Sequence, residues 1–382
     1  MTKRNKEVLT MIKVDLITGF LGSGKTTFIR KYASYLVEQG MKVGIIENDF
    51  GAINIDMVML SDLDSEMCDV EQIVGGNVET DWKRRFKAKL IAMAMQGSSI
   101  SNCDVGSVTV KLSDEGTYHI TVGCTDMGTG CDTIIAQFAA DVLETPIDNI
   151  SVYGVDTDIS PYDSGSYASS TTYLTGMAAV KACEQLRERI IALAAVRMNK
   201  DASALTFDGE NVIDESDGAK MSLFDIATAS MCNNEISLEV TYSHSSPVSP
   251  PPFLAAWAGI EADPETGAIE LLDYTACVDC GTVVNTNLAR VQTEGGLLQG
   301  IGMTLYEDIW YDERGKNLSN SFMQYKVPSR LDTDRIRVEF DSSYEPTGPF
   351  GAKSIGEIVI NTPAPAIADA VYNATGVWIN EL

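Results

Sequence analysis

The sequence predicts two parts: an α/β P-loop fragment with the order β-loop-α-β, followed by an α+β domain. Three observations predict this division. A phosphate-loop motif lies near the amino terminus, the net charge changes after the first hundred residues, and hairpin and helix patterns replace the β-loop-α-β order at the same place. We expect the boundary within Leu90–Gly97 (LIAMAMQG), so that residues 1–96 form the first part and residues 97–382 the second.

The acidic charge lies on one side of this boundary. Of 28 Lys and Arg and 54 Asp and Glu, residues 1–96 hold 13 of each sign, which leaves 15 basic and 41 acidic residues in the second part. An acidic surface of this kind repels nucleic-acid phosphates and anionic lipid, and solubility is its simplest explanation. We therefore expect neither a nucleic-acid nor a membrane partner.

The lack of long apolar segments predicts the compartment, and the cysteine usage agrees with it. The chain has no apolar run of about 18 residues, and its start, MTKRNKEVLT, lacks the apolar core of a signal peptide. This pattern predicts a cytoplasmic protein. Its eight cysteines then fit reduced thiols, and the lone Cys277-Val-Asp-Cys280 pair predicts a structural or incidental role rather than a metal site.

The first part begins with a nucleotide-binding pattern. An apolar run, Ile12–Thr18, leads into GFLGSGKT, which matches GxxxxGK[ST]; a helical pattern ending near Gly40 and a strand at Val43–Glu47 follow. Such glycines let backbone N–H groups converge on phosphate, the lysine contacts the β- and γ-phosphates, and the threonine can bind Mg²⁺. The expected nucleotide-binding residues are Gly19, Gly22, Ser23, Gly24, Lys25, Thr26 and Thr27, with Thr26 as the magnesium ligand.

The segments ITGFLGSGKTTFIRK and VGIIENDFGAINID resemble the start of a CobW-type P-loop GTPase, a group linked to metal and cobalamin-cofactor delivery. The resemblance covers about Ile12 to Met95. Of the family's cysteine-rich metal motif only Cys68 is present. No later strand ends in a magnesium-positioning acid, and no [NT]KxD guanine motif occurs. The resemblance therefore implies GTP/Mg²⁺ or phosphate binding without a complete GTPase.

The second part opens with a hairpin and a glycine loop. Val108–Leu112 and Tyr118–Val122 flank the turn sequence Asp114-Glu115-Gly116. The loop TDMGTGCDT then leads into a helix whose apolar stripe is Ile134, Ile135, Phe138 and Val142. Backbone N–H groups at such a helix start favour an anion, although a plain tight turn has the same sequence pattern.

Two further segments suggest a large polar ligand. Six hydroxyl residues lie within positions 164–172, before a long helical pattern that runs to about Met198, and they exceed what helix capping requires. The segment QTEGGLLQG, from Gln292 to Gly300, suggests a third glycine loop at a helix start. Three such loops predict one large phosphorylated cofactor.

A single carboxylate, Glu357, follows Gly356 within an apolar stretch near the carboxyl end. Desolvation there would suit Glu357 as a general base, whereas a buried glutamate bonded to backbone is the structural alternative. Thr362-Pro363 then predicts a helix start, and that helix ends before Gly376.

Four segments of the second part resemble the second half of the molybdopterin-binding subunit of the xanthine dehydrogenase/aldehyde oxidase family. They are VGCTDMGTGCDT, DTDISPYDSGSYASSTTYLTG, VDCGTVVNTNLARVQTEGGLLQGIG and YEPTGPFGAKSIGE, within about Ala94–Leu382. The resemblance implies an α+β molybdopterin-binding domain, with Glu357 as the base of a GE motif and the molybdenum held by the pterin rather than by protein ligands. The implied contacts to molybdopterin, or to its cytosine dinucleotide, are Met127, Gly128, Thr129, Gly130, Ala168, Ser169, Thr171, Thr172 and Gln292. Thr129 replaces the glutamine of many relatives.

The family's first molybdenum-binding half, with its GGGFGG loop and substrate-orienting arginine, is missing, as are iron–sulfur and flavin segments. The resemblance thus implies part of a molybdenum hydroxylase that acts on a purine or aldehyde carbon and needs partner chains. Two alternatives stay open: a nucleotide-binding protein for cofactor or metal delivery, and a non-functional fusion of two genes.

Overall fold

A computed structural model describes the backbone of residues 43–47 and 68–72 and the full structure of residues 86–231, 236–264, 266–329, 331–332 and 335–379. The chain divides into two units, Met1–Thr80 and Asp81–Leu382.

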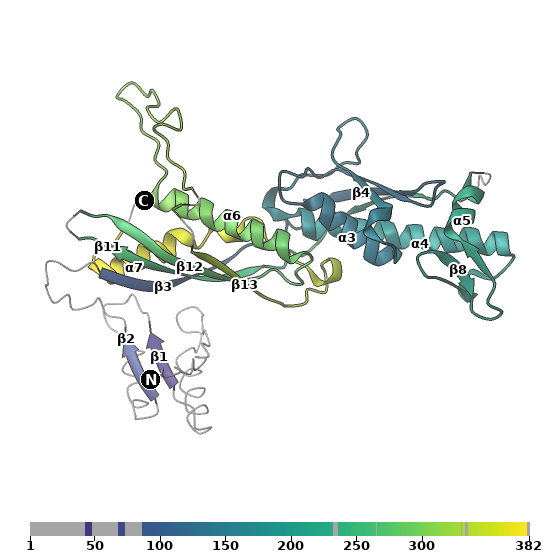
Figure 1. The fold of residues 1–382 in the computed structure, drawn as a ribbon, viewed down its shortest axis with the longest axis horizontal. Coiled ribbons are helices and arrows are strands. Elements are labelled where there is room, and N and C mark those ends of the chain that lie inside the picture. Colours follow the sequence, from purple (N-terminus) through teal and green to yellow (C-terminus); the bar gives the residue numbers. More distant parts are fainter. Residues whose placement is uncertain are drawn as a thin grey trace, which may run out of the picture. The chain divides into compact units, whose positions relative to one another are not determined.

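The first unit contains two strands among its described residues. Strand β1 (Val43–Glu47) pairs in parallel with β2 (Cys68–Gln72), with Val43 opposite Cys68 (Figure 1). The expected strand at Val43–Glu47 is confirmed. The expected strand at 12–18, the phosphate-loop residues 19–27 and the helix after them lie outside the described residues.

The second unit has two hydrophobic cores, and the first lies between a mixed sheet and two helices. The sheet order is β10-β4-β5-β6, comprising β10 (Glu239–His244), β4 (Gly106–Leu112), β5 (Tyr118–Val122) and β6 (Ile150–Tyr153). Alternate residues of β5 are buried against helices α3 (Cys131–Leu143) and α4 (Gly176–Met198), as expected for a sheet covered on one face. A small sheet of β7 (Leu205–Phe207), β8 (Asn211–Asp214) and β9 (Lys220–Ser222) extends this core, together with α5 (Leu223–Ser230).

The second core lies beneath a sheet of order β13-β12-β11-β3. These strands are β13 (Ile336–Asp341), β12 (Ile269–Asp279), β11 (Phe253–Ala262) and β3 (Phe86–Met95). Helix α7 (Pro363–Thr375) packs on β3 and β11, and α6 (Thr286–Leu305) packs on α7 (Figure 1). The unit therefore has mixed α and β content.

The unit boundary falls before the expected position between residues 96 and 97. All ten residues of β3 pair antiparallel with β11, from Phe86 opposite Ala262 to Met95 opposite Phe253. Because these residues complete the second core's sheet, the segment containing LIAMAM belongs to the second unit, which starts at Asp81.

Several expected elements are confirmed. Strands β4 and β5 form the predicted hairpin, and the stripe of α3 is buried. Helix α7 starts at Pro363 and ends at Thr375, just before Gly376, which adopts the left-handed conformation of a helix terminator. The Thr362 hydroxyl does not cap this helix but accepts a hydrogen bond from the buried Tyr274 hydroxyl at 2.9 Å.

The expectation of a third glycine loop is wrong. Asn285 caps α6 by accepting a hydrogen bond from the Leu288 amide, so the helix starts at Thr286 and Gln292 lies inside it. Two glycines within this helix, Gly296 and Gly300, have a packing role. A Cβ on Gly296 would lie 2.1 Å from Val359, and one on Gly300 would lie 2.6 Å from Pro363, so both glycines permit close approach of the following segments.

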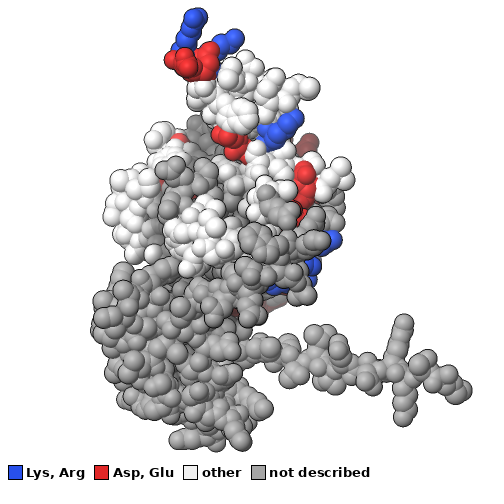
Figure 2. Space-filling model, turned by 90° about the vertical axis from the view of Figure 1, so that its left-hand side faces the viewer, with Lys and Arg blue, Asp and Glu red and all other residues white. Residues whose placement is uncertain are grey.

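On the face shown in Figure 2, the described basic and acidic side chains are interspersed, and neither sign gathers in a patch. On the edge strand β3, Lys87 pairs with Glu261 and Lys89 with Asp273. Among the described residues, no helix combines the length and the apolar character needed to cross a bilayer.

Acid should weaken the small β7–β9 sheet through Asp214. Hydrogen bonds from Lys200 and then Ser216 lower the pKa of Asp214 from 3.8 to about 2. A carboxylate with a lowered native pKa stabilises the fold above its unfolded pKa and loses that contribution as the pH falls through the native value. We expect an Asp214→Asn variant to have a lower urea midpoint than the parent at pH 7. The difference should disappear near pH 2; a constant difference would contradict this prediction.

Candidate functional site

A cavity of about 480 Å³ in the second unit brings together segments that are distant in the sequence. Its walls come from the end of β3, the glycine loop before α3, the middle of α6 and the segment that follows Gly356. The lining residues are Gln96, Gly128, Val291, Gln292, Gly295, Gly296, Gln299, Gly356, Glu357, Ile360 and Asn361.

Three predicted site residues meet in this cavity: Gly128, Gln292 and Glu357. Gln292 lies inside helix α6, where positions three, four and seven residues apart share one face. Gly295 and Gln299 therefore line the cavity together with Gln292. Gly295 has no heavy atom within 4 Å of an added Cβ, so it leaves open space in the wall.

Residues that sequence reasoning missed are mainly amides. Gln96 and Asn361 lie on separate segments, and the Asn361 amide donates to Gln96 Oε1 at 3.3 Å. Nothing in the local sequence marks either residue. Gln299, in contrast, could have been found from its helical spacing to Gln292.

Glu357 is exposed, so the expectation of a desolvated carboxylate is wrong for this chain. The apolar residues around it in the sequence do not surround it in space, because Ile358 and Val359 turn into the second core while Glu357 faces the cavity. The carboxylate contacts Ser169, whose Oγ donates to Glu357 Oε2 at 2.8 Å and accepts from the Glu357 amide at 2.8 Å.

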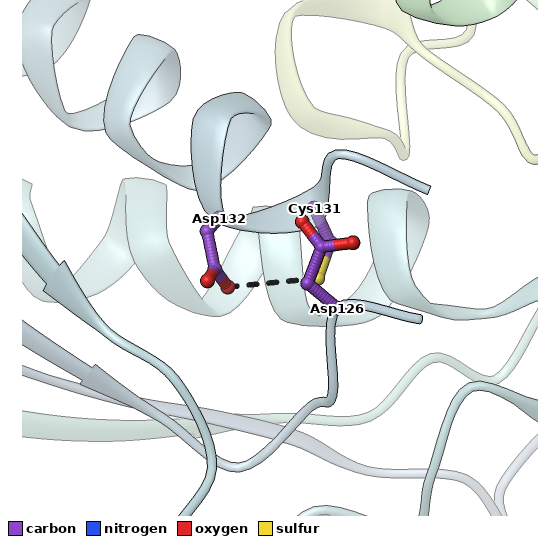
Figure 3. Close-up of side chains that lie close together, drawn as sticks. All are labelled: Asp126, Cys131 and Asp132. Carbon is purple, nitrogen blue, oxygen red and sulfur yellow. Dashed lines mark hydrogen bonds between the residues drawn. The ribbon is translucent and has the colours of Figure 1, made fainter. Parts of the chain in front are cut away.

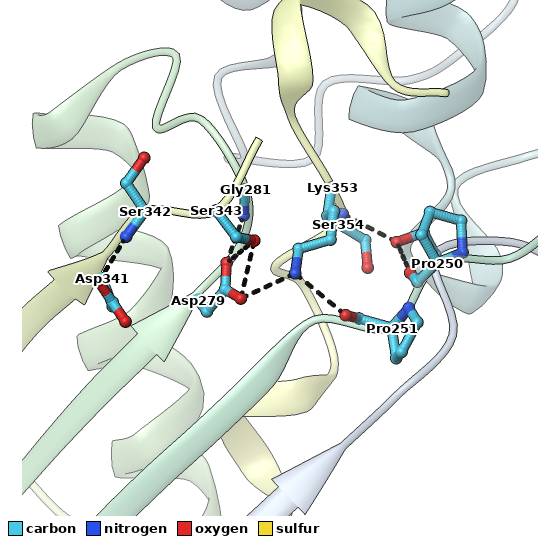
Figure 4. A network of polar contacts seen from close by, with 10 residues as sticks. Pro250, Pro251, Asp279, Gly281, Asp341, Ser342, Ser343, Lys353 and Ser354 are labelled. Carbon is cyan, nitrogen blue, oxygen red and sulfur yellow. Dashed lines mark hydrogen bonds and ion pairs between the residues drawn. The ribbon is translucent and has the colours of Figure 1, made fainter. Parts of the chain in front are cut away.

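The segment just before Glu357 is fixed by a buried network (Figure 4). Lys353 Nζ lies 2.9 Å from Asp279 Oδ2, donates to the Pro251 carbonyl at 3.1 Å and lies 5.5 Å from the centre of the Phe253 ring. The Ser354 amide donates to Ser98 Oγ. The Lys353-Ser354 backbone is thereby anchored to the strand ends beside the cavity.

Asp279, at the end of β12, is the anion of this network. Burial alone would raise the pKa of its carboxyl, but hydrogen bonds from the Gly281 amide, Lys353 and Ser343, with the positive charge of Lys353, lower the pKa overall. The charged form is therefore the one that the fold stabilises.

The glycine loop before α3 contains its own anion (Figure 3). Asp126 Oδ1 accepts hydrogen bonds from the amides of Gly128, at 2.9 Å, and Gly130, at 3.1 Å. Both glycines have positive φ, and a Cβ on Gly130 would meet Leu288 of α6 at 2.6 Å. Two of the N–H groups expected to hold a ligand phosphate therefore bind the loop's own carboxylate. No side chain caps the start of α3.

Two cysteines lie beside this loop. Cys131 Sγ donates to Asp132 Oδ1 at 3.7 Å and accepts from Cys124 Sγ at 4.0 Å (Figure 3 shows Asp126, Cys131 and Asp132). The hydrogen bond to Cys131 and burial raise the pKa of Cys124, while burial and the charge of Asp126 raise the pKa of Asp132. Because a thiol reacts as its thiolate, the structure favours a packing role for Cys124.

The hydroxyl-rich segment is largely bonded to protein groups. Ser164 binds the Val105 backbone, Ser170 donates to the Gly165 carbonyl, and Thr171 donates to Ser166. Most of the hydroxyls whose number suggested an extended ligand thus have partners within the fold. A π-helical turn, η4 (Thr171–Thr175), follows, and such turns occur frequently at functional sites.

The remaining predicted contacts lie on the same two loops. Met127 is exposed and Thr129 half-buried beside Gly128, while Ala168 and Thr172 flank the bonded hydroxyls. Ala168 and Ser169 both have positive φ, at 51° and 60°.

Residues 69–334, more than half of the chain, match the family model of the molybdopterin cofactor-binding domain. The chain belongs to this family. The molybdopterin-binding domain overlaps a second match, because residues 13–105 fit the CobW/HypB/UreG nucleotide-binding domain. The chain therefore joins parts of two families, and β3 lies within the overlap of the two matches.

Relatives of the molybdopterin-binding domain include two proteins of Escherichia coli K12. The chain is 37% identical over 293 residues to the probable hypoxanthine oxidase XdhD, covering 76% of this chain and 30% of that protein. It is 30% identical over 285 residues to the putative xanthine dehydrogenase molybdenum-binding subunit XdhA, covering 73% of this chain and 38% of the subunit.

Solved structures agree with this assignment. The Cu,Mo-CO dehydrogenase matches 76% of this chain with a TM-score of 0.70 and 26% identity, and quinoline 2-oxidoreductase of Pseudomonas putida 86 matches 77% with a TM-score of 0.71 and 25% identity. The matches cover 38% and 40% of those chains. The chain thus spans about a third of the length of the curated relatives given above.

Proposed function

We propose that the second unit is the molybdopterin-binding portion of a molybdenum hydroxylase, with Glu357 as its general base. The observation that supports this most directly is the cavity that joins Glu357 to Gln292 and Gly128 in a molybdopterin cofactor-binding domain. The relatives named for hypoxanthine and xanthine support hydroxylation of a purine carbon, and a relative named as the aldehyde oxidoreductase molybdenum-binding subunit PaoC supports an aldehyde carbon. Because the chain spans about a third of those relatives, we further propose that turnover requires iron–sulfur and flavin partner chains and the first molybdenum-binding half.

The lining of the cavity fits a pterin. Apart from Glu357, its polar side chains are the amides Gln96, Gln292, Gln299 and Asn361, which both donate and accept hydrogen bonds, as the edges of a heterocycle require. No Lys or Arg occurs among the lining residues, so this wall suits a neutral ring better than phosphate. A dinucleotide extension would lie instead along the residues of 127–130 and 168–172.

Four residues of this wall have a defined task in the proposed reaction. The bound group supplies a molybdenum centre that exchanges electrons with the substrate. Gln292 and Gly128 bind and orient it, the open space at Gly295 admits it, and Glu357 takes the proton at its carboxylate. The network around Lys353 keeps the segment that carries Glu357 in place.

A Gly295→Leu variant tests cofactor binding directly. Leucine is a better helix former than glycine and meets no neighbour at Cβ, so the variant should fold while its side chain fills the cavity. We expect molybdenum and pterin in the parent purified from a cofactor-producing host, and at least a tenfold loss in Gly295→Leu. Gly295→Ala, which adds only a Cβ, is the matched control. A parent without molybdenum, or equal contents in all three proteins, would contradict the proposal.

The match to the CobW/HypB/UreG domain supports a second candidate function, binding of GTP with Mg²⁺ at Gly19–Thr27. In this proposal Lys25 contacts phosphate and Thr26 the metal. Calorimetric titration of the parent and a Lys25→Ala variant with Mg²⁺-GTP tests it. Binding by the parent that Lys25→Ala abolishes would support a nucleotide-binding role, and absence of binding in the parent would remove it.

A further inference from the structure

We propose that Ser169 is a positioning residue for Glu357, rather than only a contact to the cofactor. This inference rests on the proposed role of Glu357 as the base. The resemblance to the family implied a cofactor contact for Ser169, whereas the structure bonds its hydroxyl to Glu357.

The contact is reciprocal. Ser169 Oγ donates to Glu357 Oε2 and accepts from the Glu357 amide, both at 2.8 Å. One hydroxyl therefore fixes the backbone and the carboxylate of the same residue. Since the Glu357 side chain is exposed, this bond restrains a carboxylate that would otherwise sample several rotamers in solvent.

The backbone on both sides is built for this approach. Ala168 and Ser169 both adopt left-handed conformations, which are costly for residues with a Cβ and persist only where the surroundings hold them. On the other side, a Cβ on Gly356 would lie 3.0 Å from Ser169 Oγ. Strain in one segment and a glycine in the other thus bring the hydroxyl to the carboxylate.

The bond also joins distant parts of the second unit. Ser169 precedes α4, which packs in the first core, and Glu357 precedes residues of the second core. A base held by the first core's loop stays at one place in the cavity wall, and such placement affects rate strongly, since a shift of about 1 Å can cost about 10²-fold.

The first test uses the cofactor-free chain. Urea midpoints are measured for Ser169→Ala, Glu357→Ala and the double variant, with Ser166→Ala as the matched control, because Ser166 bonds Thr171 on the same loop. We expect the Ser169 and Glu357 effects to be non-additive, as for residues in contact, and the Ser166 and Glu357 effects to add. Additivity of Ser169 and Glu357 would overturn the proposal whatever the cofactor content of the parent.

The second test uses protein assembled with its cofactor and partner chains. We expect Ser169→Ala to lower kcat by about 10- to 100-fold while KM and molybdenum content stay within twofold of the parent. Loss of molybdenum in proportion to activity would overturn the positioning role in favour of cofactor contact. A parent without molybdenum would contradict the proposed function instead, and the additivity measurement would then decide the contact by itself.

Discussion

A Glu357→Gln variant is expected to lose turnover by a factor of about 10²–10⁴ in the assembled enzyme, with unchanged molybdenum content. Glutamine keeps the size of the side chain and an oxygen that can accept the Ser169 hydrogen bond, but it cannot take a proton at neutral pH. The measurement is the rate at which excess substrate reduces the assembled enzyme in a single turnover. This rate separates the chemical step from later electron transfer.

Glu294→Gln supplies the matched control, since Glu294 lies on α6 next to the lining residue Gly295 but does not itself line the cavity. Its rate should equal that of the parent. If Glu357→Gln reacts within twofold of this control, Glu357 is not the base.

Removal of the Lys353 charge is expected to destabilise the second unit by about 3–5 kcal/mol. The side chain of Lys353 is 5% exposed and that of Asp279 20%, so a Lys353→Met variant leaves a largely buried carboxylate without its cation. Urea unfolding at pH 7 measures the loss. Because the native pKa of Asp279 is lowered, its stabilising contribution is present above the unfolded pKa and disappears as the pH falls through the native value.

Two comparisons make this prediction specific. Lys89→Met removes an ion pair of similar length, 2.8 Å to Asp273, from a lysine side chain that is 64% exposed, and should cost no more than about 1 kcal/mol. Adding Asp279→Leu to Lys353→Met should restore much of the stability, because no unpaired charge then remains. Equal losses for Lys353→Met and Lys89→Met would contradict a buried role for Lys353.

Local patterns in the sequence predicted the elements that local physics decides. The hairpin of β4 and β5 follows from alternating burial around a glycine turn, and α7 follows from a proline start and a glycine stop. The pattern failed at Gln292, because paired glycines usually interrupt helices; here Val359 and Pro363 pack against Gly296 and Gly300 and keep α6 continuous. Tertiary packing decided the outcome.

The candidate site was predicted only in part, because tertiary packing also decides which residues line it. Family motifs named Gly128, Gln292 and Glu357, which share the cavity, but the exposure of Glu357 depends on where the chain turns after it. The roles of Gln96 and Asn361 depend on which distant segments become neighbours. Asp126 is easy to place in the glycine loop from the sequence. That its carboxylate accepts a hydrogen bond from an amide of the same loop becomes visible only in the folded turn.

Strand β3 pairs with a strand that lies far along the chain. During synthesis β3 is made before its hydrogen-bonding partner β11, which begins only at Phe253, so β3 stays unpaired while the buried residues of the first core are translated. Such long-range pairing is slow, and an unpaired strand with exposed Ile91, Met93 and Met95 invites association between nascent chains. Lys87 and Lys89 place charge on the same strand and oppose that association until Ala262 has left the ribosome.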